Sequence, residues 1–172
     1  MGSAQWLVFA VALLRLAELA HARRNARRLL ARGGEEHGAG HYPLLVALHA
    51  AWLVAIFVAV PPATPPCLPC ALLFAALLAA RAWTIWSLGP YWTTRVITLP
   101  EAPLVRRGPY RFMRHPNYAI VAAEIAVLPL IFGAWRLALL FSALNGALLW
   151  HRIRIEDRTL ALRDPTAPRA RR

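Results

Sequence analysis

The sequence contains no lysine, and only 16% of its 172 residues are charged. Because lysine is absent, all 20 basic residues are arginine, and with 8 acidic residues they give a formal net charge of +12. In a soluble domain this charge would suggest nucleic-acid binding. Here the arginines fall between apolar segments, and 59% of the chain is hydrophobic, far from the balance of an ordinary soluble domain. We therefore expect an integral membrane protein with no nucleic-acid partner.

A linker between domains is also absent, because no polar or Gly/Ser-rich stretch is long enough to connect two of them. We expect a single membrane domain over residues 1–172. Residues 1–90 would supply three N-terminal transmembrane helices. Residues 91–172 would supply a polar motif, a helical hairpin and a cytoplasmic C-terminal tail.

Cysteine and histidine are too few and too scattered to predict a metal or redox centre. Cys67 and Cys70 form the sequence CLPC, but no thioredoxin-like βαβ pattern surrounds it. We interpret the two cysteines as small residues at a helix start, and the alternative is a redox pair. The histidines outside the polar motif have no ligand spacing, so we expect no metal.

Five apolar segments predict the fold class. They cover Ala4–Ala22, Tyr42–Val60, Cys67–Leu88, Asn117–Phe132 and Trp135 to about Ile153. A helix needs about 20 apolar residues to cross a bilayer core, which the second and third segments supply. The last two are shorter and separated only by Gly133 and Ala134, so we expect them to pack as a hairpin. The prediction is an all-α membrane protein with about five transmembrane helices.

The arginines also predict the topology. They follow the first, third and fifth segments, whereas the connection PPATPP after the second segment has no charge. Because short cytoplasmic loops are rich in arginine, the N-terminus is predicted outside, and the polar motif and the C-terminus inside. The first segment has no basic region before it and no small-residue cleavage site, so we interpret it as a retained helix. The expected location is a bacterial plasma membrane.

A polar stretch, RRGPYRFMRHPNY (Arg106–Tyr118), interrupts this apolar sequence. Gly108-Pro109 indicates a turn, and His115-Pro116 indicates a helix start. Arginines that contact lipid phosphates would explain Arg106 and Arg107 but not the polar residues around the helix start. Free N–H groups and the helix dipole favour an anion there.

A second polar group lies at the end of the last apolar segment. Asn145, Leu149, Arg152 and Glu156 are spaced by four, three and four residues, so they form one stripe on a helix. An interfacial Arg152–Glu156 ion pair is the simple alternative. However, ionisable groups at membrane depth are costly and usually face a cavity or each other. Because the hairpin places its two ends together, we expect the stripe and the helix start at His115 to line one cytoplasmic cavity.

Together these residues resemble the isoprenylcysteine carboxyl methyltransferase family of integral membrane enzymes, which use S-adenosyl-L-methionine (SAM). The resemblance rests on GPYRFMRHPNY, the apolar hairpin after it and the following RIRIED, and it covers roughly Val96–Leu162. The sequences RVITLP and NYAIVAAEIAVLPLIF further resemble a bacterial subgroup associated with type III polyketide synthases. That resemblance implies an alkylpyrone acceptor and a polyketide synthase as a possible neighbour.

By position, the resemblance implies SAM contacts and one acceptor contact. The implied SAM contacts are Ala102, Pro103, Leu104, Val105, Tyr110, His115, Pro116, Asn117, Tyr118 and Glu156. Arg152 takes the place of the arginine that handles the methyl acceptor. Where the family usually has paired glutamates, this chain has Glu156-Asp157. The chemistry is consistent with these assignments, because methyl transfer needs alignment more than a strong base and an arginine can hold an anionic acceptor.

Other functions stay open. The acceptor could be an alkylpyrone hydroxyl, a prenylcysteine-like carboxylate or a phospholipid amine, and its tail would enter from the bilayer. A membrane reductase of sterol-reductase-like architecture would need a nicotinamide site, but the sequence has no Gly-rich fingerprint. A non-catalytic protein that binds lipid or a partner through its arginine loops would leave the Arg152–Glu156 stripe unexplained.

Overall fold

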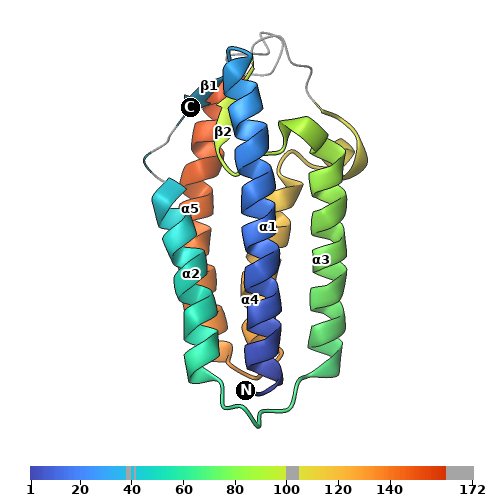
Figure 1. Ribbon diagram of the computed structural model, residues 1–172, viewed down its shortest axis with the longest axis vertical. Coiled ribbons are helices and arrows are strands. Elements are labelled where there is room, and N and C mark those ends of the chain that lie inside the picture. Colours follow the sequence, from blue (N-terminus) through green and yellow to red (C-terminus); the bar gives the residue numbers. More distant parts are fainter. Residues whose placement is uncertain (38–39, 41, 100–104, 162–172) are drawn as a thin grey trace.

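Five α-helices account for most of the fold (Figure 1). The structure, a computed structural model, describes residues 1–37, 40, 42–99 and 105–161, with side chains up to Asp157. The α-helices are α1 (Ser3–Ala31), α2 (Tyr42–Ala59), α3 (Leu68–Leu88), α4 (Pro116–Leu130) and α5 (Trp135–Ala161). Two short 3-10 helices, η2 (Gly89–Tyr91) and η3 (Gly108–Arg111), and two strands, β1 (Glu35–His37) and β2 (Val96–Thr98), complete the described elements.

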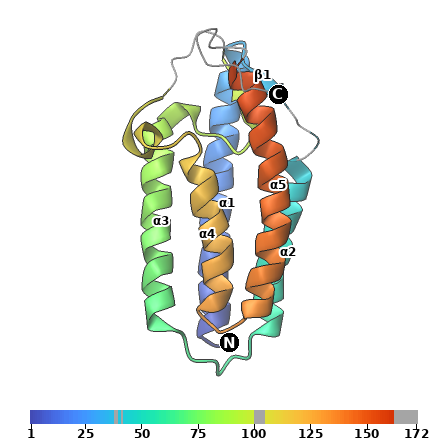
Figure 2. The same ribbon diagram turned by 180° about the vertical axis from the view of Figure 1, so that it is seen from behind.

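The α-helices run side by side along the long axis, so the α2–α3 connection and the α4–α5 turn lie at one end (Figures 1 and 2). Figure 2 shows α4 and α5 as neighbours, as predicted for the hairpin. Gly133 makes the reversal possible because its φ is 68°, in the left-handed region that glycine adopts at no steric cost. The start of α4 and the end of α5 therefore lie together at the opposite end of the bundle.

Among the described residues, three stretches are long and apolar enough to cross a membrane: Ser3–Ala31, Tyr42–Ala59 and Leu68–Tyr91. The mostly helical membrane fold is confirmed to this extent. The shorter α4 is apolar, and a crossing by α4 and α5 stays a prediction. The first apolar segment, Ala4–Ala22, lies within α1, and the helix continues past it to Ala31. Arginine and leucine are good helix formers, so the helix does not stop where its sequence turns polar.

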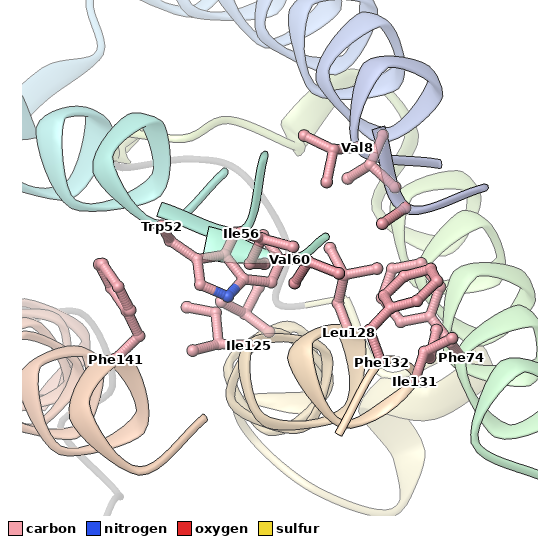
Figure 3. Close-up of a cluster of buried hydrophobic side chains, with 13 residues drawn as sticks. Val8, Trp52, Ile56, Val60, Phe74, Ile125, Leu128, Ile131, Phe132 and Phe141 are labelled. Carbon is pink, nitrogen blue, oxygen red and sulfur yellow. The ribbon is translucent and has the colours of Figure 1, made fainter. Parts of the chain in front are cut away.

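The hydrophobic core lies where α2, α4 and α5 meet and extends toward α1 and α3. Figure 3 shows Trp52 of α2 between Phe141 of α5 and Ile125 of α4. Val8 of α1 and Phe74 of α3 belong to the same buried cluster. This core fixes the α4–α5 hairpin, and so it sets the position of every side chain at the far ends of these two helices.

A two-stranded antiparallel sheet covers the end opposite the α4–α5 turn. β1 pairs with β2 in the register Glu35↔Thr98, Glu36↔Ile97 and His37↔Val96. The ion pair between Arg95 and Glu36, at 2.9 Å, supports the pairing. The sequence did not predict these strands, because three residues are too few to show a period-two pattern. Through this pairing, the segment that follows α1 is hydrogen-bonded to the segment that leads into the polar motif.

Four charged residues form a closed cluster between α1, α3 and α4, and we call it the charge cluster: Arg15, Glu18, Arg81 and Glu124. Arg15 bonds Glu18 at 2.6 Å and Glu124 at 3.0 Å. Arg81 bonds Glu18 at 2.9 Å and Glu124 at 3.3 Å. Each guanidinium therefore contacts both carboxylates, and the cluster has no net charge. Charges within membrane helices usually pair in this way.

Candidate active site

The chain that leads into α4 is fixed against the end of α3. Gly108 has a φ of 58°, and a Cβ on it would lie 2.1 Å from the Ser87 Oγ, so only glycine fits. The Arg107 Nε donates a hydrogen bond of 2.8 Å to the Ser87 carbonyl oxygen. The predicted turn and the helix start are confirmed, because η3 begins at Gly108 and α4 begins at Pro116 with His115 as its N-cap. The start of α4 is thus held by tertiary contacts.

Tyr118 joins α4 to α5. Its hydroxyl donates a hydrogen bond to the Glu156 carboxylate. It accepts one of 2.7 Å from the Arg152 Nε. The Arg152 guanidinium also lies over the Tyr118 ring, 5.3 Å from its centroid. Arg152 and Glu156 are therefore linked through the tyrosine hydroxyl, unlike the direct ion pair considered from the sequence.

His115 contacts both carboxylates at the end of α5. Its Nε2 lies 3.0 Å from Asp157 Oδ1, and its Nδ1 lies 3.8 Å from Glu156 Oε1. The His115 ring stacks on the Tyr118 ring at a centroid distance of 5.3 Å. The side chains of Glu156 and Asp157 are 28% and 46% exposed, so both carboxylates still face open space. Asp157 therefore belongs to the same cluster, although the family resemblance implied no role for it.

Tyr110 and Asn117 lie beside these residues. Burial, and then the charge of Glu156, raise the pKa of Tyr110 well above its usual range, so its hydroxyl is a neutral donor at physiological pH. The Asn117 Oδ1 is buried and has no hydrogen-bond partner in the described part of the chain. A buried oxygen without a partner is costly, so the arrangement favours a ligand or water at this point.

Of the remaining predicted contacts, the structure describes Pro116 and Val105. Pro116 is buried at the first position of α4. Val105 is half-buried before the arginines of the motif. Ala102, Pro103 and Leu104 lie outside the described residues. The structure therefore brings together six of the predicted cofactor contacts and Arg152, around the start of α4.

Deeper in the bundle, the buried face of α5 carries a further polar residue. Asn145 is completely buried, and neither its amide nitrogen nor its amide oxygen has a partner among the described residues. The Ser142 Oγ, one turn further along, is also without one. Asn145 lies two helical turns, about 10 Å, from Arg152 on the same face of α5. The stripe predicted from the sequence therefore leads from the site toward the membrane interior.

A model of the isoprenylcysteine carboxyl methyltransferase family matches residues 68–162, more than half of the chain. The chain belongs to this family. The matched region begins with α3 and includes the polar motif, the hairpin and all the site residues described above. Family membership supports the activity of a membrane methyltransferase.

A relative in Bacillus subtilis (strain 168), the uncharacterized protein YpbQ, extends this similarity to the N-terminal helices. It is 36% identical over an alignment of 160 residues, which covers 90% of this chain and 95% of that protein. The similarity therefore includes α1 and α2, which the family model does not match. No solved structure matches the chain.

Within this member of the family, the sequence interpretation missed the charge cluster. Each of Arg15, Glu18, Arg81 and Glu124 lies within an apolar segment, and the sequence analysis assigned no role to any of them. A signal was available, because the two acids and two arginines in the first four apolar segments balance each other. What the sequence lacked was the lateral order of the helices, which decides which of these charges meet.

Proposed function

We propose that the chain transfers a methyl group from SAM to an oxygen atom of a lipophilic acceptor. The single observation that carries this proposal is the bonded series Arg152–Tyr118–Glu156, which joins a cation and a carboxylate at the end of an apolar hairpin. The cation suits an anionic acceptor, and the carboxylate suits the amine of SAM. Tyr118 fixes the position of each relative to the other.

The described residues fit SAM. The start of α4 offers the positive end of the helix dipole, which suits its carboxylate, and His115 lies at this position. The partly exposed Glu156 can accept hydrogen bonds from its amine, and the unpartnered Asn117 Oδ1 can accept another. When bound, SAM supplies a methyl group that is already activated by the sulfonium. The protein therefore needs only to align the acceptor with it.

Arg152 is the acceptor's anchor in this proposal. Its Nε donates a hydrogen bond to the Tyr118 hydroxyl. In this proposal its Nη1 and Nη2 donate to an anionic oxygen of the acceptor, and their planar arrangement suits a carboxylate or an enolate. Such an acceptor arrives ionised, so no strong general base is required. Of the three acceptor classes considered, the alkylpyrone hydroxyl and the prenylcysteine-like carboxylate are consistent with this requirement.

The acceptor's tail would lie along the buried face of α5, below Arg152. Asn145 offers an unpartnered donor and an unpartnered acceptor on this face, which suits a further oxygen of the acceptor. The topology that we propose places the Arg152 end of the hairpin on the cytoplasmic side of a bacterial plasma membrane. SAM would then enter from the cytoplasm and the acceptor from the bilayer.

The test is direct measurement of SAM binding to the purified protein in detergent by calorimetry, followed by methyl transfer to an alkylpyrone and to a prenylcysteine. We expect binding and transfer to at least one acceptor class. Absence of SAM binding by the folded protein would refute the methyltransferase proposal. Labelling of cysteines introduced at Gly34 and Ala63 in intact cells tests the topology, and access to position 34 from outside would contradict it.

A further inference from the structure

A groove opens between α1 and α3, and none of the site residues around the start of α4 lines it. It has a volume of about 530 Å³, within the range of about 300–1,000 Å³ that ligand sites occupy. The two helices are joined at its base by the Glu18–Arg81 ion pair and at its end by Asn25, whose Nδ2 donates to the Gly89 carbonyl oxygen at 3.2 Å. The groove is therefore a fixed feature of the α1–α3 pair.

The lining changes from apolar to polar along the groove. The apolar part is lined by Leu14, Leu78, Ala82 and Ile85. The opposite part is lined by His21, Asn25 and Arg28, with Gly89 and Pro90 beside them. A ligand that fills this groove must have a long apolar part and a polar end. This is the chemical character of a membrane lipid.

The length of the groove agrees with one bilayer leaflet. From Leu14 to Arg28, α1 rises about 21 Å. Half of a bilayer, headgroups included, is about 20–22 Å thick. Trp86, which lines the groove and is 82% exposed, lies near its polar end, where tryptophan usually marks the headgroup level. The groove thus spans from the headgroups toward the middle of the membrane.

The charge at the polar end favours an anionic headgroup. Glu18 is neutralised within the charge cluster, whereas no carboxylate in the described part of the chain lies within ion-pair distance of Arg28. Arg23, Arg24 and Arg27 are exposed on the same turns of α1. Basic residues at this depth attract anionic lipids.

We propose that the α1–α3 groove is a binding site for one anionic phospholipid of the leaflet that contains the arginine-rich end. Arg28 binds the headgroup phosphate, His21 and Asn25 line the glycerol region, and one acyl chain lies along Leu14 and Leu78. The bound lipid covers the lipid-facing side of the charge cluster. The site is separate from the methyl-transfer site, and the inference does not depend on the proposed function.

Native mass spectrometry of the whole protein, with phosphatidylglycerol or phosphatidylcholine of the same acyl chains, tests this site. We expect wild type to retain one phosphatidylglycerol with clear preference over phosphatidylcholine. Arg28→Gln should reduce that retention about five-fold, the scale of one arginine at an anionic surface. Arg27→Gln is the matched control, because Arg27 is exposed on the same helix but does not line the groove.

A second pair of variants tests the apolar part. Ala82→Trp fills the groove and should abolish retention of phosphatidylglycerol, whereas Ala79→Trp, on an exposed position outside the groove, should not. Equal losses in Arg27→Gln and Arg28→Gln would show diffuse surface attraction and overturn the proposal. Equal retention of the two lipids by wild type, or full retention by Ala82→Trp, would also overturn it.

Discussion

The charge cluster contains two guanidinium groups for two carboxylates, whereas the site at the start of α4 contains one guanidinium, from Arg152, for the two carboxylates of Glu156 and Asp157. In the charge cluster the side chains are at most 15% exposed, and each arginine contacts both glutamates. At the site the carboxylates are 28% and 46% exposed, and the Asn117 Oδ1 has no partner among the described residues.

In the charge cluster the protein pairs every charge, whereas at the site a polar oxygen has no partner in the part of the chain that the structure describes. Every charge of the charge cluster is satisfied by the protein, so the cluster holds α1, α3 and α4 together and offers nothing to a ligand. The site retains carboxylate surface and an unpartnered oxygen, which a bound molecule can satisfy. Mutations should therefore affect folding in the first case and binding in the second.

The largest expected effect comes from opening the charge cluster. Arg81→Leu leaves Glu18 and Glu124 close together with one arginine between them, and removing one partner of a buried network costs about 3–5 kcal/mol. We expect a large loss of thermal stability in detergent. Replacement of all four residues by leucine removes every charge, and it should restore most of that stability because buried ion pairs are often replaceable by apolar residues. An Arg81→Leu protein as stable as wild type would contradict the structural role.

The next effect concerns turnover. Arg152→Ala should lower the rate of methyl transfer at least about 100-fold, because the acceptor's anionic oxygen loses its partner. The protein should stay folded. Arg152→Lys should recover only part of the activity, since an ammonium lacks the planar pair of donors. Methyl transfer and SAM affinity are measured for both variants. Loss of SAM affinity in Arg152→Ala equal to that in Glu156→Ala would assign Arg152 to the SAM half of the site.

Removal of the SAM contacts should have a smaller and separate effect. His115→Ala and Glu156→Ala should each weaken SAM binding by about 1–3 kcal/mol, the scale of a hydrogen bond to a charged group. Thermal stability should change little, because both side chains are partly exposed. Calorimetry with SAM checks the prediction, and unchanged affinity in both folded variants would exclude the proposed pocket.

Replacing Asn145 should make the protein more stable but weaken its binding of the acceptor. Its unpartnered amide is costly in the bundle, so Asn145→Leu should stabilise the protein by about 1–2 kcal/mol. If the amide binds the acceptor, the same change should raise the KM for the acceptor and leave SAM affinity unchanged. Ser142→Ala is a milder variant on the same face. A more stable Asn145→Leu protein with unchanged acceptor kinetics would show that the amide has no role in acceptor binding.

The sequence predicted the polar residues at the start of α4 and on α5, because helical spacing places residues on one face and a hairpin brings its ends together. Both arguments are local. The hydrogen bond from Tyr118 to Glu156 depends on the rotation of α4 against α5, which the apolar pattern does not specify. The meeting of Glu124 with Arg15 depends on the lateral order of α1, α3 and α4. Helices that are apolar on most faces carry little information about that order.

The smallest expected effect, and the sharpest test of the comparison, comes from the Tyr118 hydroxyl. Tyr118→Phe retains the ring that stacks on His115 and removes only the group that links Arg152 to Glu156. The Glu156 carboxylate stays partly exposed and can still bind SAM, so SAM affinity should fall by only about 0.5–1.5 kcal/mol, the scale of one hydrogen bond. A double-mutant cycle with Arg152→Ala measures the coupling. If Tyr118 transmits the position of Arg152 to Glu156, SAM affinity in the double mutant should equal that in Tyr118→Phe. Additive losses would show that Arg152 and Tyr118 act on SAM independently, and would remove the link that distinguishes this site from a collection of separate charges.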